Sequence, residues 1–242
     1  MTEARRVALF VTCLVDQVLP EVGVATVRLL RRAGFKVEFP VAQTCCGQPF
    51  HNSGHTSEAV RLAKRTVEIL GDYPTVVLPS GSCAAMIRVE YPHLLEPWPD
   101  WHSRAQALAA KTFELSEFLV EQAGWMPVRA ASAPAVTYHD SCHMCRMLQL
   151  GAEPRKLLAA SGHRVNEMRE SDRCCGFGGL FSLRMPEVSN AMTTEKVAQA
   201  NETGAPILAS ADPGCIIQMR GLAPEDGLQI EHIATLLEAA SR

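Results

Sequence analysis

The sequence predicts an α/β fold made of two tandem, pseudo-symmetric lobes, each with a mainly parallel, Rossmann-like sheet flanked by helices. Two observations predict this class. Short apolar runs alternate with amphipathic segments along the 242 residues, as expected of β-α units around a parallel sheet. A Cys-Cys-Gly tripeptide at residues 45–47 also returns at residues 174–176, which indicates an internal repeat. We therefore expect a first lobe at 1–125, a linker at 126–133 and a second lobe at 134–242.

The first half begins with an apolar run from Arg6 to Thr12, which predicts a buried strand that delivers Cys13 at its carboxyl end. A helix is expected from Pro20 to Arg32, because proline is favoured in the first turn and Gly34 supplies a stop. The other elements expected in this half are strands at Lys36–Pro40 and Thr75–Pro79, and helices at Ser57–Leu70, from Cys83 onward and at Phe113–Gln122.

The second half repeats this order of elements. Even the helix stop recurs, since Gly-His-Arg-Val at 162–165 parallels Gly-Phe-Lys-Val at 34–37. Between the halves, the small-residue stretch 124–134 is a better boundary than the proline- and tryptophan-rich stretch 91–101. The elements expected in the second half are strands at Ala135–His139, Arg164–Met168 and Pro206–Ser210, and helices at Glu153–Ala160, Val188–Asn201 and His232–Ala239.

Eight of the nine cysteines fall into two matched sets. In each set a lone cysteine precedes the Cys-Cys pair by 32 residues, and another cysteine follows the pair. All are expected in strand-to-helix loops, at the carboxyl edge of the sheet where such folds place their ligands. We therefore expect each set to converge on one metal site. The expected ligands are Cys13, Cys45, Cys46 and Cys83 in the first lobe, and Cys142, Cys174, Cys175 and Cys215 in the second.

Four thiolates suit either a tetrahedral zinc ion or an iron-sulfur cluster. The glycine after each pair permits positive φ, so a sharp turn can aim two adjacent thiols at one site. The alternative to metal ligation is that these cysteines are buried apolar side chains, but packing alone does not explain why both sets have the same spacing. Neither set has the paired Cys-x-x-Cys clips usual in structural zinc sites. We therefore expect one or two 4Fe-4S clusters, with zinc in one lobe as the alternative.

Composition excludes several function classes. A formal net charge of −3 and a pI near 6.2 argue against a nucleic-acid partner, which requires concentrated positive charge. No apolar run reaches the roughly 18 residues of a membrane helix, and the N-terminal apolar run is too short for a signal peptide. Nine cysteines without an export signal predict a cytoplasmic protein with reduced thiols.

Other residues near the cysteines are weaker candidates. Cys145 forms a Cys-x-x-Cys pair with Cys142, but Asp16 stands at its place in the first half; we interpret it as a spare thiol, with a role as cluster ligand as the alternative. Asp212 either supplies an oxygen ligand or tunes the cluster through hydrogen bonding, or is simply part of an Asp-Pro-Gly turn. Four histidines are candidates for proton donation or support of the cluster, against an ordinary structural role: His51, His55, His139 and His143.

These motifs resemble the CCG cysteine-rich domain family. The resemblance rests on CCGFGGLFS at 174–182, DPGC at 212–215, HDSCH at 139–143 and the segment 44–55, and it spans nearly the whole chain. Length and motif order are most similar to the A subunits of L-lactate utilisation complexes. The resemblance implies an iron-sulfur electron-transfer subunit of a multi-subunit L-lactate-oxidising dehydrogenase complex, with a ferredoxin-type iron-sulfur protein among its partners.

Two departures separate the chain from other members. Heterodisulfide reductase subunits carry Cys-x-x-Cys where this chain has Ser80 before Cys83 and Asp212 before Cys215, so five thiols per cluster are not expected. Glycolate oxidase subunits resemble the chain but add ferredoxin motifs, which this sequence lacks. A heterodisulfide reductase-like or glycolate oxidase-like subunit and a zinc-stabilised structural module remain the alternatives.

Overall fold

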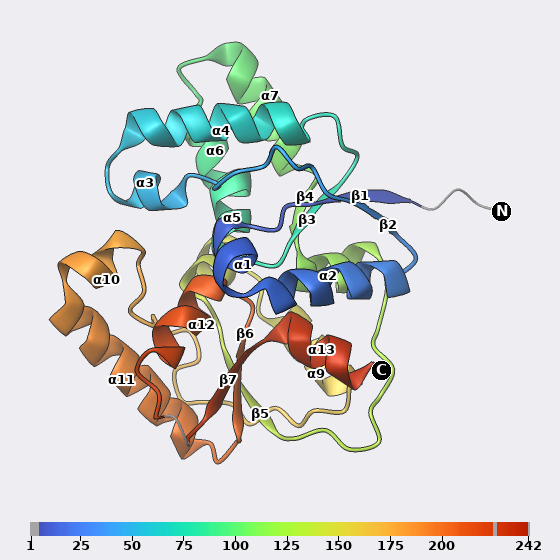
Figure 1. Ribbon diagram of the computed structural model, residues 1–242, viewed down its shortest axis with the longest axis vertical. Coiled ribbons are helices and arrows are strands. Elements are labelled where there is room, and N and C mark those ends of the chain that lie inside the picture. The colour runs from blue at the N-terminus through green and yellow to red at the C-terminus, as the bar shows by residue number, and fades with distance from the viewer. Residues whose placement is uncertain (1–4, 225–226, 242) are drawn as a thin grey trace.

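The computed structural model describes residues 5–224 and 227–241, and within them the chain folds as two parallel sheets flanked by helices. The first half forms the upper part of the molecule in Figure 1 and the second half the lower part. The predicted α/β class with two similar lobes is confirmed.

The first sheet has the strand order β2-β1-β3-β4, all parallel. Its strands are β1 (Arg6–Leu9), β2 (Lys36–Glu38), β3 (Val76–Leu78) and β4 (Thr112–Glu114). The helices of this half are α1 (Cys13–Val18), α2 (Pro20–Arg32), α3 (Gln48–Asn52), α4 (Thr56–Leu70), α5 (Gly81–Ala85), α6 (Tyr91–Leu94), α7 (Pro99–Ala109) and α8 (Leu115–Glu117), with π-helical turns η1 (Met86–Glu90) and η2 (Phe118–Gln122).

The second sheet repeats this order with strands β5-β6-β7, again parallel. Its strands are β5 (Val136–His139), β6 (Ile207–Ser210) and β7 (Gln229–His232). The helices are α9 (Ala152–Ala160), α10 (Leu180–Arg184), α11 (Pro186–Glu202), α12 (Pro213–Arg220) and α13 (Ile233–Ala240), with the π-helical turn η3 (His143–Met147).

Two predicted elements differ from the observed ones. The strand expected at Arg164–Met168 is a single bridge between Val165 and Val136, and the side chain of Asn166 donates a hydrogen bond to the carbonyl of Thr203 instead. The closing helix expected at 113–122 begins with strand β4, whereas the one expected at 232–239 matches α13 to within one residue. The stretch 91–101, weighed as a boundary between the halves, contains α6 and the start of α7.

The two halves pack reciprocally through their closing helices. In Figure 1, α13 of the second half lies along α2 of the first half. In the same way, α8 and η2 of the first half contact α9 of the second. Arg28 and Arg32 each lie 3.4 Å from the buried carboxylate of Glu238 across this contact. One hydrophobic cluster consequently includes side chains of both halves. The division of the chain at residues 126–133 stays a prediction.

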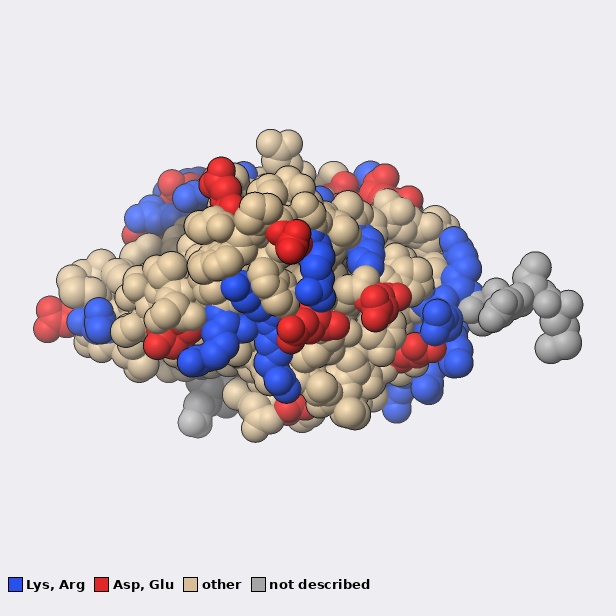
Figure 2. Space-filling view, turned by 90° about the horizontal axis from the view of Figure 1, so that it is seen from above, with Lys and Arg blue, Asp and Glu red and all other residues tan. Residues whose placement is uncertain are grey.

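The surface carries charges of both signs. On the face in Figure 2, lysine and arginine side chains are interspersed with aspartate and glutamate. Within residues 5–224 and 227–241, the helices are all too short or too polar to span a bilayer.

Candidate metal centre

The first cysteine set comes together at the carboxyl edge of the first sheet. Cys13 opens α1, the adjacent Cys45 and Cys46 precede α3, and Cys83 lies in the first turn of α5. The Sγ atoms of Cys13 and Cys45 are 3.6 Å apart, and those of Cys46 and Cys83 are 3.2 Å apart. Sequence positions far apart thus form one group of thiols, as the strand-to-helix pattern predicts.

The second set repeats this arrangement. Cys142 precedes η3, Cys174 and Cys175 precede α10, and Cys215 lies in the first turn of α12. Ligand atoms of Cys175, Cys215 and His139 all lie within 4.8 Å of one another.

The glycine after each pair shapes the loop as expected. Gly47 and Gly176 have φ of 87° and 90°, a region that glycine enters without strain. Each backbone N–H then turns back to donate a hydrogen bond to the first sulfur of its pair, at 3.4 Å to Cys45 and 3.4 Å to Cys174.

A buried hydroxyl fixes the second cysteine of each pair. Tyr91 donates a hydrogen bond to the carbonyl oxygen of Cys46 at 2.7 Å, and Thr193 donates one to that of Cys175 at 2.7 Å. Sequence reasoning missed both residues, because they lie on helices well removed from the cysteine motifs and differ in type between the halves.

In both lobes, the first cysteine of the Cys-Cys pair accepts hydrogen bonds from two other thiols. The pKa of Cys45 falls to about 3, because Cys13 and then Cys46 donate hydrogen bonds to its sulfur. The pKa of Cys174 falls to about 2 through the equivalent bond from Cys142 and then that from Cys175. One thiolate per set is therefore available at neutral pH before any metal binds, and thiolates are the metal-binding form of cysteine.

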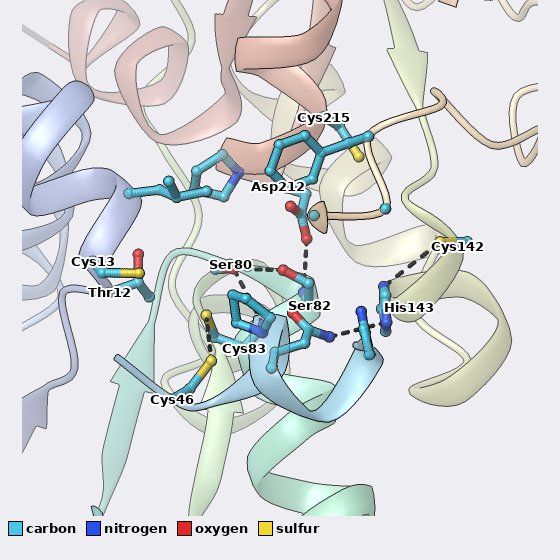
Figure 3. A pocket seen from close by; sticks show the side chains of 18 of the residues that line it. Thr12, Cys13, Cys46, Ser80, Ser82, Cys83, Cys142, His143, Asp212 and Cys215 are labelled. Carbon is cyan, nitrogen blue, oxygen red and sulfur yellow. Dashed lines mark hydrogen bonds between the residues drawn. The ribbon is translucent and has the colours of Figure 1, made fainter. Parts of the chain in front are cut away.

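Both sets open onto one cavity between the lobes. It holds about 850 Å³ of empty space, its open mouth included. All eight cysteines of the two sets line it, and Figure 3 shows Cys13, Cys46 and Cys83 on one side, with Cys142 and Cys215 on the other. The lining contributed by the cysteines is Cys13, Cys45, Cys46 and Cys83 from the first half, and Cys142, Cys174, Cys175 and Cys215 from the second.

Asp212 joins the two walls. Its carboxylate is 3% exposed and accepts hydrogen bonds from the N–H of Ser82 in the first half at 2.7 Å and from that of Gly214 in its own helix at 3.1 Å (Figure 3). Ser80, at the matching place, caps α5 by accepting from the N–H of Cys83 at 3.3 Å. The two departures from Cys-x-x-Cys are therefore helix caps, and the one at Asp212 also links the lobes.

The other predicted candidates separate into two groups. His143 lines the cavity, with Nδ1 3.6 Å from the sulfur of Cys142 and Nε2 3.0 Å from the side-chain nitrogen of Gln48. Cys145 is half-buried outside this lining, and its sulfur lies 3.8 Å from the carbonyl of Cys142. His51 pairs with Glu90 and His55 packs on Phe50, both away from the cysteines, whereas His139 is buried beside the second set.

The donor chemistry fits a metal held by thiolates. A Zn–S bond of about 2.3 Å places two sulfurs of one tetrahedral site roughly 3.8 Å apart, close to the 3.6 Å between Cys13 and Cys45. Four cysteines are also the usual ligands of a 4Fe-4S cluster, and the cavity beside each set offers room for more than a single ion.

Comparisons with known proteins agree with this geometry. Residues 7–88 and 136–220 match the CCG cysteine-rich domain family. The chain is 46% identical over 237 residues to lactate utilization protein A of Bacillus subtilis (strain 168), covering 97% of this chain and 99% of the relative. It is 45% identical to the protein of that name from Geobacillus kaustophilus (strain HTA426), with the same coverage.

A crystal structure of a hypothetical protein from Helicobacter pylori has the same fold. It superposes with a TM-score of 0.72 at 11% identity, over 99% of this chain and 49% of that one. The repeated cysteine sets, the matched family segments and the close relatives over almost the full length lead to one conclusion. The chain belongs to the CCG cysteine-rich domain family, in the branch that includes lactate utilization protein A.

Proposed function

We propose that this chain is an iron-sulfur electron-transfer subunit of a multi-subunit complex that oxidises L-lactate. The observation that carries the proposal is the pair of matched four-thiol sets on the two walls of one cavity. The similarity to lactate utilization protein A over 97% of the chain supports lactate as the source of the electrons.

The residues of this chain hold and shield the two centres. When bound, a 4Fe-4S cluster supplies one-electron transfer at a potential set by its surroundings. The cysteines of each set provide thiolate donors, and the loops after the pairs donate backbone N–H groups to Cys45 and Cys174. Phe177 lines the cavity beside the second set and limits its contact with water.

We assign lactate binding to a partner rather than to this cavity. The wall carries the buried carboxylate of Asp212, and a negative charge in a poorly hydrated wall repels the carboxylate of lactate. Electrons released from lactate would then reach this chain through a ferredoxin-type iron-sulfur partner, in the reducing cytoplasm that keeps free thiols available.

A zinc-stabilised structural module is the second candidate function. It is favoured by the 3.6 Å between the sulfurs of Cys13 and Cys45, which is near the roughly 3.8 Å edge of a tetrahedral zinc-thiolate site. This candidate predicts tightly bound zinc and no effect of lactate on the oxidation state of the protein.

Growth on L-lactate tests the proposal in the source organism. Deleting the gene should abolish growth on L-lactate, and the wild-type chain should restore it. The variants Cys45→Ser and Cys174→Ser should fail to restore growth, whereas Cys145→Ser, which changes the thiol outside the cavity lining, should succeed. Unaffected growth after deletion, or full rescue by Cys45→Ser and Cys174→Ser, would refute the proposal.

A further inference from the structure

A buried imidazole stands beside the second cysteine set without a clear structural role. His139 is the last residue of β5 and is 0% exposed. Neither ring nitrogen makes a well-formed hydrogen bond to any residue that the structure describes. Burying polar nitrogens without partners is costly, so a buried ring of this kind indicates a ligand that satisfies it.

The position of the ring identifies the class of ligand. A nitrogen of His139 and the sulfurs of Cys175 and Cys215 lie within 4.8 Å of one another, and all three side chains are buried. Nitrogen and thiolate sulfur together are a common donor set for zinc and other transition metals.

The backbone of Ser171 lies beside the ring of His139. Its carbonyl is suited to receive one ring N–H, since ligating histidines usually donate their second nitrogen to a carboxylate, carbonyl or water.

The first lobe has an apolar side chain at the matching place. Phe10 lies three residues before Cys13, as His139 lies three residues before Cys142. Phe10 is 1% exposed and packs in the cluster that contains Cys46 and Cys83. The two lobes thus carry a buried ring at matching positions, but only the ring of the second lobe has nitrogen donors.

We propose that His139 is a ligand of the second metal centre, binding through an imidazole nitrogen together with Cys175 and Cys215. The first centre, which has Phe10 at this place, has thiolate ligands alone. The inference rests on metal binding by the second cysteine set.

Cobalt(II) bound to the full-length, metal-free protein under anaerobic conditions provides the test. With ¹⁵N-labelled histidine, electron-nuclear double resonance should detect a histidine nitrogen strongly coupled to cobalt. The coupling should vanish in His139→Phe, which inserts the residue of the first lobe. Affinity for the second cobalt ion should fall at least about 10-fold, the lower end of the loss seen when even a supporting residue is removed.

The matched control is His143→Gln, which removes the other imidazole beside Cys142 and should leave the coupling unchanged. His139→Asn is a second variant in case the phenylalanine does not fold. If neither folds, a coupling that survives His143→Gln in the otherwise wild-type chain still supports the proposal. No strongly coupled nitrogen in the wild type, or a coupling lost in His143→Gln, would overturn it. The proposed electron-transfer function is refuted by a different result, namely growth on L-lactate that is unaffected by deletion of the gene.

Discussion

The contact of Asp212 with both lobes leads to a specific prediction for stability. Replacing it with alanine removes the acceptor of two backbone hydrogen bonds, from Ser82 at 2.7 Å and Gly214 at 3.1 Å. A hydrogen bond to a charged group contributes about 1.5–3 kcal/mol, and a buried donor left unpaired adds to the loss. Asp212→Ala should therefore lower the free energy of unfolding by about 3–5 kcal/mol, and Asp212→Asn, which keeps one acceptor oxygen, by about half as much.

Urea unfolding of the metal-free protein, followed by far-UV circular dichroism under reducing conditions, measures this change. The control is Ser80→Ala, which removes the matching cap in the first lobe. Its hydroxyl accepts one longer backbone hydrogen bond, from the N–H of Cys83 at 3.3 Å, and lies 3.2 Å from the hydroxyl of Ser82. Neither contact crosses between lobes, so the loss should cost about 1 kcal/mol. If Asp212→Ala lies within about 0.5 kcal/mol of the wild type, or if Ser80→Ala costs more, the linking role of Asp212 is wrong.

Three further changes test other parts of the site and fold. A Cβ at Gly176 would lie 2.5 Å from a backbone oxygen of α11, whereas one at Gly47 would come no closer to its neighbours than 3.2 Å, to a side-chain carbon. Gly176→Ala should therefore destabilise the protein more than Gly47→Ala, which should cost about 1–2 kcal/mol for its left-handed backbone; equal melting temperatures would contradict this. Thr193→Val leaves the carbonyl of Cys175 without its 2.7 Å hydrogen-bond donor and should lower the free energy of unfolding in urea by about 1–3 kcal/mol. An unchanged midpoint of the urea transition would contradict this. Burial raises the pKa of Glu114 to about 8, above its unfolded value near 4.3, so the protonated form favours the folded state and that stability is lost as pH rises through 8. Relative to Glu114→Gln, the free energy of unfolding of the metal-free wild type should fall by on the order of 1 kcal/mol per pH unit between about pH 5 and 8. Parallel pH profiles of the two proteins would rule this out.

Local signals predicted some elements closely. The helix expected from Pro20 to Arg32 is α2 with the same bounds, because proline at its start and Gly34 with φ of 88° at its end are both encoded locally. The turn at each Cys-Cys-Gly tripeptide was predictable for the same reason. Strand β1 was also found in the right place, although it ends at Leu9 rather than Thr12.

Features that depend on tertiary contacts were not predictable in this way. Strand β4 was read as the start of a helix, since it has only three residues and gains its identity from pairing with β3. Strand β7, of four residues, was not predicted and likewise depends on pairing with β6. The sequence repeat predicted two thiol sets. Their meeting at one cavity depends on how the lobes pack, and the spacing of the cysteines along the chain gives no information about that packing. His139 was one of four histidines near cysteines, and only its burial and its place beside Cys175 and Cys215 distinguish it.

The central claim is that the two thiol sets hold iron-sulfur clusters, and metal analysis of anaerobically purified protein tests it most directly. Iron, zinc and acid-labile sulfide should be measured on the same sample as an absorption spectrum, for the wild type, Cys45→Ser and Cys174→Ser. The account predicts about four to eight iron atoms per chain with matching sulfide and absorption near 400 nm, as expected of cysteine-ligated clusters, and a loss of iron in each variant. Zinc without sulfide in the wild-type protein would contradict it.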